Sequence, residues 1–116
     1  MHIDGPALLL RIYIGEADHE GGKPLFQVIV ERLRERGIAG ATVLRGIEGF
    51  GATSHLHTTR ILRLSEDLPL VIEVVDAEAR LRALLPELDA LVGDGLITVQ
   101  PIEVIAYRGT SPDPPG

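Results

Sequence analysis

The order in which two hydrophobic periodicities follow one another is the feature that most constrains how this chain folds. Apolar residues alternate over residues 7–14, as in a strand, and recur at helical spacing over residues 25–33. Later segments repeat this change of period, at residues 41–44, 68–75, 81–92 and 96–107. The order predicts a ferredoxin-like βαββαβ sandwich of the α+β class: a four-stranded antiparallel sheet, two helices on one face, and a long loop after the second strand.

Single residues mark the expected ends and interruptions of these elements. Pro24 is a favourable first residue for the first helix, and Gly37 is suited to end it. Asp76 is expected to cap the second helix, and Pro86 to kink that helix or split it. Pro101 lies inside the last extended segment, where a proline indicates an edge strand or a bulge. The first strand is apolar on most of both faces and is expected to lie inside the sheet.

Both faces of the expected central strands are apolar, although two helices cover only one face. In the segment 68–75, Leu70, Ile72 and Val74 point to one side, while Val71 and Val75 point to the other. A large exposed apolar sheet is unfavourable in a monomer. We therefore expect other copies of the chain to bury the second face, in a homo-oligomer.

Length and composition bound the remaining possibilities. The chain has 116 residues, no cysteine and a formal net charge of −6. This size predicts one domain over residues 1–109, followed by a disordered, proline-rich tail over residues 110–116. The lack of cysteine excludes disulfides, thiolate metal sites and a cysteine nucleophile. An acidic chain with a single lysine is unsuited to nucleic acid, and the sequence shows neither a basic leader nor a long apolar run. We expect a cytoplasmic protein without direct membrane insertion.

The most distinctive polar segment is residues 46–51, in which three glycines occur within six positions. Such a segment lets the backbone approach a ligand closely, but it lacks the ending of a phosphate-binding P-loop. His55 and His57 are two positions apart, so in an extended segment both rings point the same way and suit zinc or copper if a third ligand is supplied. No nucleophile motif surrounds Ser54 or Ser65, and we expect no enzyme activity.

Several motifs together carry a family resemblance. Gly49-Phe-Gly51, then Leu68-Pro69 before Val71-Ile-Glu-Val-Val75, then Gly93-Asp-Gly-Leu-Ile-Thr-Val99, have the order and spacing of PII signalling proteins over residues 7–109. The runs Leu44-Arg-Gly-Ile-Glu-Gly-Phe-Gly51 and Leu62-Arg-Leu-Ser-Glu-Asp-Leu-Pro69 are similar to bacterial PII-like proteins, a conserved family of unknown function. The resemblance implies a homotrimeric regulator without a bound cofactor. It also implies ligand clefts between subunits and a long loop, about residues 46–59, that contacts a protein target such as a membrane transporter.

The sequence departs from PII proteins at the positions that bind phosphate in that family. Ala52 and Thr53 stand where PII proteins have an Arg-Gln pair, and Leu70 and Leu96 stand where they have lysines. Triphosphate binding in the PII manner therefore lacks several charge-assisted contacts. Arginines are the candidates to hold a smaller anion or a monophosphate instead, at Arg45, Arg60, Arg63 and Arg108.

The expected ligand is an adenine nucleotide or a small anion. The free backbone amides of residues 93–95 are a candidate anion site. The residues that we expect to line the ligand site are Arg45, Gly46, Gly49, Phe50, Gly51, Arg60, Gly93, Asp94, Gly95 and Arg108.

Two other functions remain open at the level of the sequence. One is a trimeric metal-binding protein that uses His55 and His57 and resembles the copper-tolerance proteins that share this fold. Equilibrium dialysis with zinc or copper, before and after replacing both histidines by alanine, separates this function from the sensor. The other is a small ferredoxin-like enzyme with a histidine or carboxylate in a pocket between sheet and helices.

Overall fold

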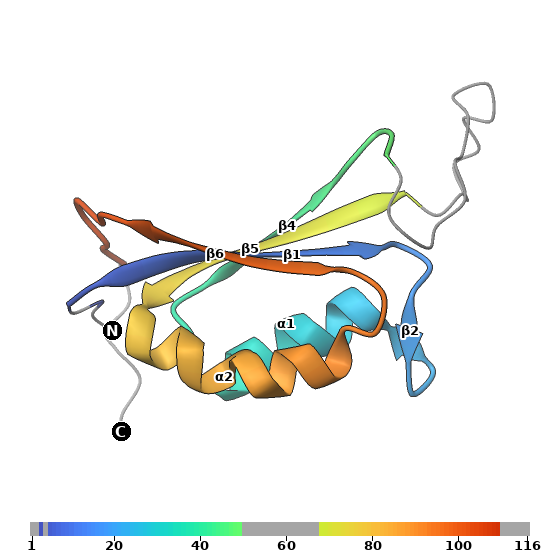
Figure 1. Cartoon of the computed structure of the whole chain (residues 1–116), viewed down its shortest axis with the longest axis horizontal. Helices are drawn as coiled ribbons and strands as arrows, with labels where there is room; N and C mark the ends of the chain where they lie inside the picture. Colours follow the sequence, from blue (N-terminus) through green and yellow to red (C-terminus); the bar gives the residue numbers. More distant parts are fainter. Residues whose placement is uncertain (1–2, 4, 50–67, 110–116) are drawn as a thin grey trace.

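The structure is a two-layer sandwich of one sheet and two helices (Figure 1). The computed structural model describes residues 3, 5–49 and 68–109. The sheet has the order β4-β5-β1-β6, all neighbours being antiparallel, with strands β1 (Ala7–Gly15), β4 (Ala41–Arg45), β5 (Pro69–Ala77) and β6 (Leu96–Ile102). Helices α1 (Leu25–Glu35) and α2 (Glu78–Leu91) lie on the same side of the sheet. The predicted ferredoxin-like arrangement is confirmed, and β1 lies inside the sheet as expected.

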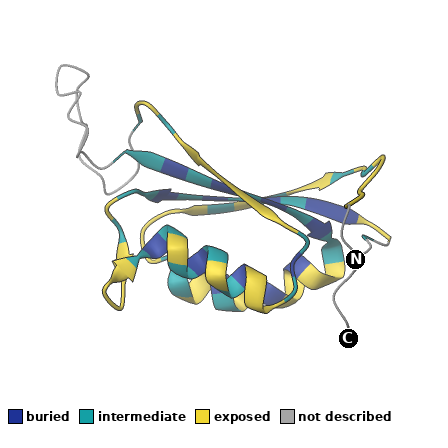
Figure 2. Cartoon of the chain, turned by 180° about the vertical axis from the view of Figure 1, so that it is seen from behind, coloured by how far each residue is buried: buried dark blue, intermediate teal, exposed yellow. Residues whose placement is uncertain are grey.

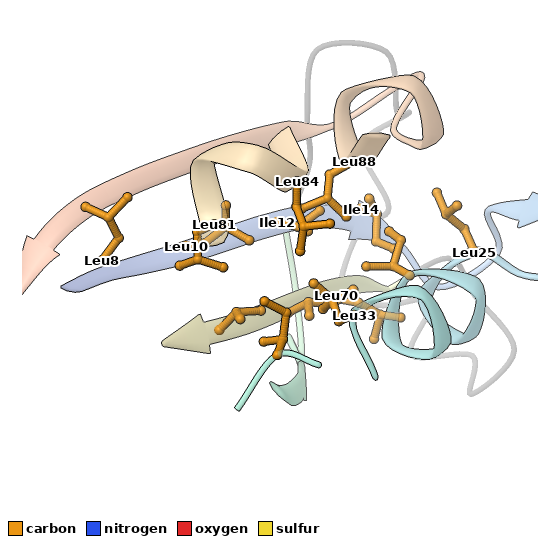
Figure 3. Close-up of a cluster of buried hydrophobic side chains, with 14 residues drawn as sticks. Leu8, Leu10, Ile12, Ile14, Leu25, Leu33, Leu70, Leu81, Leu84 and Leu88 are labelled. Atoms are coloured by element: carbon orange, nitrogen blue, oxygen red, sulfur yellow. The ribbon is translucent and has the colours of Figure 1, made fainter. Parts of the chain in front are cut away.

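The core fills the space between the sheet and the helices (Figure 3). The strands contribute alternate residues, namely Leu8, Leu10, Ile12 and Ile14 from β1 and Leu70, Ile72 and Val74 from β5. The helices contribute residues at helical spacing, namely Leu25, Ile29 and Leu33 from α1 and Leu81, Leu84 and Leu88 from α2. The two periods seen in the sequence therefore mark the two layers that meet in the core.

The first helix begins and ends close to the predicted residues. Pro24 is the residue just before α1, where its φ of −56° suits the entry into a helix. Gly37 has φ +76°, which a glycine adopts without strain. Its N–H donates to the Arg34 carbonyl at 3.1 Å, and the Ile38 N–H donates to the Leu33 carbonyl at 3.1 Å. This pattern is a Schellman motif, which ends the helix and brings Ile38 into the core.

The second helix begins differently from the prediction. Strand β5 continues through Ala77, so α2 starts at Glu78, and the prediction that Asp76 caps this helix is wrong. Asp76 lies on the helix side of the sheet and is completely buried, where its carboxylate accepts the N–H groups of Ala39 at 2.9 Å and Ala77 at 2.6 Å. The predicted split at Pro86 does not occur. Pro86 cannot donate to the carbonyl of Arg82, but both residues are exposed, so water can bond that carbonyl instead.

The last strand is shorter than predicted. It ends at Ile102, which pairs with Ala7, the first residue of β1, so the strand has no partner beyond that point. Pro101 lies on this edge strand, as its position in the sequence indicated.

A small hairpin precedes α1 and was not predicted. Strands β2 (His19–Glu20) and β3 (Lys23–Pro24) pair across a two-residue turn, in which Gly21 and Gly22 have φ of +59° and +83°. Two adjacent glycines are a known signal for such a turn. The flanking strands have two residues each and are too short to show any alternation, so the sequence gives no further signal for the hairpin.

One carboxylate on α2 binds two arginines, one within α1 and one at the C-cap of that helix. Glu87 accepts hydrogen bonds from Arg32 Nη1 at 3.0 Å and from Arg36 Nε at 3.1 Å. The hydrogen bond from Arg36 is the largest cause that lowers the pKa of Glu87 below its ordinary value. Because the pKa is lower in the folded state, this contribution to stability is present at neutral pH and is lost as the pH falls through the folded pKa.

We therefore expect acid to remove the difference between the wild type and Glu87→Gln. The urea midpoint of the wild type should lie above that of Glu87→Gln at neutral pH, and the two should converge as the pH falls from about 5 to about 3. Urea unfolding followed by circular dichroism measures this, with Glu103→Gln, at an exposed position, as the control. Midpoints of the wild type and Glu87→Gln that stay equally far apart at every pH would contradict the assignment.

Candidate functional site

Residues 46–49, called the glycine turn below, follow β4 and are held against the first residue of β5, at one end of the sheet. The Gly46 N–H donates to the Pro69 carbonyl at 2.7 Å, so the ladder between β4 and β5 continues one residue past β4. A Cβ atom would lie 2.8 Å from Pro69 Cγ at Gly46 and 3.2 Å from it at Gly49. The two glycines therefore let the turn lie against the proline ring, at the point where the segment 50–67 leaves and rejoins the described chain.

Arg45 lies at this end and forms an ion pair with Glu16. Its cross-strand partner is Leu70, whose side chain faces the core, so Arg45 projects from the helix side of the sheet. The Glu16 N–H donates to the Leu68 carbonyl at 2.8 Å, which fixes the backbone that carries the carboxylate. The Arg45 side chain is 60% exposed. Since a guanidinium has five N–H donors, several remain for an anion beside Glu16.

Residues 93–95 form the turn between α2 and β6. A Cβ atom at Gly95 would lie 2.5 Å from the Tyr13 carbonyl oxygen and 2.8 Å from Val92 Cγ1. The close approach to the backbone of β1 thus explains this glycine without a ligand. Neither Gly93 nor Gly95 has a positive φ, so these glycines do not supply the left-handed residue of an anion-binding nest. Asp94 is exposed.

The predicted ligand residues occupy separate places in one chain. Arg45, Gly46 and Gly49 lie together beside Pro69. The turn at residues 93–95 lies at the same end of the sheet but at the opposite edge, three strand spacings or about 14 Å away. Arg108 lies at the other end, because its neighbour Tyr107 donates its hydroxyl to the Ala39 carbonyl at 3.2 Å, ahead of β4. The other predicted residues lie outside the described part of the chain, namely Phe50, Gly51 and Arg60, together with Arg63, His55 and His57.

The face of the sheet opposite the helices is called the open face below (Figure 2). The register of the strands places its side chains in rows across the sheet. One row is apolar and spans all four strands, with Leu44, Val71, Tyr13 and Leu96 in register. The next row is polar, with Thr42, Glu73, Arg11 and Thr98 in register. Leu44 and Leu96 are 47% and 55% exposed, which is unusual for large apolar side chains in a sheet.

An ion pair occupies the middle of the open face. Arg11 and Glu73 are direct cross-strand partners, and Arg11 Nε lies 2.9 Å from Glu73 Oε2. The side chains are 35% and 32% exposed, and the hydrogen bond that Arg11 donates to Glu73 raises the pKa of Arg11. A charged side chain inside a sheet needs a partner of opposite charge, and Arg11 is that partner for Glu73.

A groove of about 390 Å³ opens on the same face, and sequence reasoning missed it. Its floor includes Leu9, Glu73 and Val75, and its wall includes Val104 and Tyr107. It forms because residues 103–107 leave β6 and return toward Ala39. The pattern of these residues continues that of β6, so the sequence offers no signal for the change of direction.

The part of the chain that the structure describes contains neither a candidate metal centre nor a helix that could span a membrane. No group of three or more histidine and acidic side chains there has the arrangement of a metal site. Since His55 and His57 lie outside it, the metal-binding alternative stays a prediction. None of the helices in this part is long and apolar enough to cross a bilayer.

One family model matches most of the chain. Residues 7–104 match the model of the DUF190 family, described as uncharacterized ACR, COG1993. This chain belongs to the DUF190 family. A UPF0166 protein of Aquifex aeolicus (strain VF5) is 39% identical to this DUF190 chain over 97 residues, which cover 84% of the chain and 91% of that protein.

Solved structures show that this DUF190 chain has the fold of PII-like proteins. A putative PII-like signaling protein from Thermus thermophilus matches with a TM-score of 0.62 at 17% identity, covering 86% of this chain and 90% of that one. CPII from Thiomonas intermedia K12, solved with ADP and bicarbonate bound, matches with a TM-score of 0.55 at 22% identity, covering 86% and 89%. The predicted membership of a conserved family of unknown function is confirmed by the DUF190 match, and the predicted likeness to PII-like proteins is confirmed for the fold.

Proposed function

We propose that this DUF190 chain is the subunit of a homotrimeric PII-like regulator that binds an adenine nucleotide or a small anion between subunits. In this proposal the segment of about residues 46–59 contacts a target protein, and the chain carries out no catalysis. CPII, which shares the fold, has been solved with ADP and bicarbonate bound. The match of fold supports the choice of these ligands as probes.

One observation carries the intersubunit site. Arg45 and Gly46 lie at one edge of the sheet and the 93–95 turn lies at the other, at the same end and about 14 Å apart. A small anion cannot contact both places in a single chain. A site that uses both therefore needs a second copy, and the partly exposed apolar row on the open face supports a copy packing there.

The chemistry of the Arg45 end favours a ligand with less charge than a triphosphate. Arg45 is the described arginine beside the glycine turn, and Glu16 already offsets part of its charge. The leucines at positions 70 and 96 add no positive charge, and Leu70 is buried in the core. A monophosphate, a diphosphate or a planar anion such as bicarbonate needs fewer charged contacts and suits the guanidinium fork.

Calorimetric titration with ADP, AMP and bicarbonate, singly and together, tests the proposal. We expect saturable binding of at least one of them, and a ligand at a hundred times its Kd should stabilise the fold by about 2.7 kcal/mol. Arg45→Ala should weaken binding by about tenfold or more, because a charge-assisted contact is lost. Arg82→Ala, which removes an exposed arginine of a surface ion pair on α2, is the matched control. Absence of binding by all three ligands would contradict the sensor.

A further inference from the structure

The two edges of the sheet differ in what they offer to another strand. The hydrogen bond from the Gly46 N–H to the Pro69 carbonyl fixes the alternation of the β4–β5 ladder. It places the N–H and C=O groups of Ala41, Val43 and Arg45 on the side away from β5. All five residues of β4 are exposed, so these groups form an open edge (Figure 2).

The edge of β6 is protected in a way that the edge of β4 is not. The hydrogen bond from the Glu16 N–H to the Leu68 carbonyl identifies which residues of β1 bond to β5. The other residues of β1 bond to β6, and the register gives their partners in that strand. By this alternation Pro101 is one of the residues that face the outer edge. A proline there offers no N–H and hinders the approach of another strand. No proline interrupts β4, which is therefore the more receptive edge.

A groove of about 360 Å³ adjoins the open edge on the helix side. Its lining includes Val30 and Leu33 of α1 and Ile38, which leads toward β4. Val43, 37% exposed, points to the same side because it is the cross-strand partner of Ile72. Arg34 also lines the groove, which has no carboxylate in its lining, and it forms no ion pair within the described ranges. The groove is thus apolar with a positive rim.

We propose that the edge of β4 and this groove bind an extended segment of a partner protein, which adds to the sheet as a further strand. Every second side chain of such a segment would point toward α1, so one apolar side chain enters the groove and an acidic one lies beside Arg34. Arg34 is the charged residue in the lining of this groove, so it favours an acidic side chain at the facing position of the partner segment. The inference goes beyond the nucleotide site, because the groove is at the Ala41 end of β4 and Arg45 is at the other end of that strand.

Selection of random dodecapeptides on the full chain provides the probe, and fluorescence polarisation then measures each recovered peptide. We expect recovered peptides to alternate apolar and polar residues and to contain an acidic residue. Val43→Pro removes an outward N–H while keeping the β4–β5 ladder, and it should weaken binding by about tenfold or more. Arg34→Glu should have a similar effect. Arg34 is exposed in the last turn of α1, so this change should cost no more than about 1 kcal/mol of stability. Arg82→Glu, the same charge change on α2, should leave binding unchanged.

Hydrogen exchange locates the peptide on the surface. Binding should slow exchange of the Ala41, Val43 and Arg45 amides. Recovery of no peptide, unchanged affinity in Arg34→Glu, or protection confined to other residues would overturn the proposal, even if Val43→Pro fails to fold. The proposal would also be overturned if the edge amides were already protected in the free protein and lost this protection on dilution, because a second copy would then occupy the edge. Since nucleotide titration reports on Arg45 alone, either proposal can fail without the other.

Discussion

Replacing Val71 by aspartate is expected to convert the proposed trimer into monomers that keep their fold. Val71 lies in the apolar row of the open face, between Leu44 and Tyr13, and no helix covers it. If copies of the chain bury roughly 1,000 Å² of apolar area there, the gross gain is on the order of 25 kcal/mol, before association costs. An unpaired carboxylate in that interface costs on the order of 3 kcal/mol or more, which weakens association by at least about a hundredfold.

Light scattering after gel filtration measures this effect. The wild type should have the mass of a trimer at micromolar concentration, and Val71→Asp that of a monomer with an unchanged far-ultraviolet spectrum. Ala83→Asp introduces the same charge at an exposed position of α2 and should stay trimeric. A monomeric wild type would contradict the trimer and, with it, the intersubunit ligand site.

The layers of the fold could be predicted because they depend on local alternation. A strand presents every second side chain to the core, so Leu70, Ile72 and Val74 identify their shared face without any knowledge of the partner strands. Helical spacing likewise identifies Leu81 and Leu84. The open face consists of the strand positions that alternate with the core positions, so the same alternation predicts it.

Features that depend on distant partners could not be predicted in this way. Strand β6 ends at Ile102 because β1 begins at Ala7, and the sequence of β6 contains no information about that partner. Arg45 is the last residue of β4, and Arg108 lies beyond the end of β6. The order β4-β5-β1-β6 and the return of residues 103–107 place these two exposed arginines at opposite ends of the sheet. A ligand site assembled from such residues requires the topology, and an intersubunit site also requires the assembly.

Asp76 is the clearest case of a residue whose role depends on its surroundings, and its replacement should have a large effect on stability. Its buried carboxylate accepts the N–H groups of Ala39 and Ala77 at 2.9 and 2.6 Å, and Arg80 Nη1 lies 3.7 Å away. Asp76→Ala leaves both N–H groups without an acceptor, at about 1–3 kcal/mol each. We expect the free energy of unfolding to fall by about 3–5 kcal/mol, a large share of the stability of a typical domain.

Urea unfolding of Asp76→Ala and Asp76→Asn separates hydrogen bonding from the mere loss of a charge. Asparagine keeps one acceptor oxygen, so Asp76→Asn should lose about half as much stability as Asp76→Ala. Asp94→Ala removes an exposed carboxylate and should change stability by less than about 0.5 kcal/mol. Because Asp76 holds the N–H of Ala39, which comes just before β4, Asp76→Ala should speed amide exchange at the start of β4 as well. Equal losses in Asp76→Ala and Asp94→Ala would show that the buried carboxylate does not hold β4 to the end of β5.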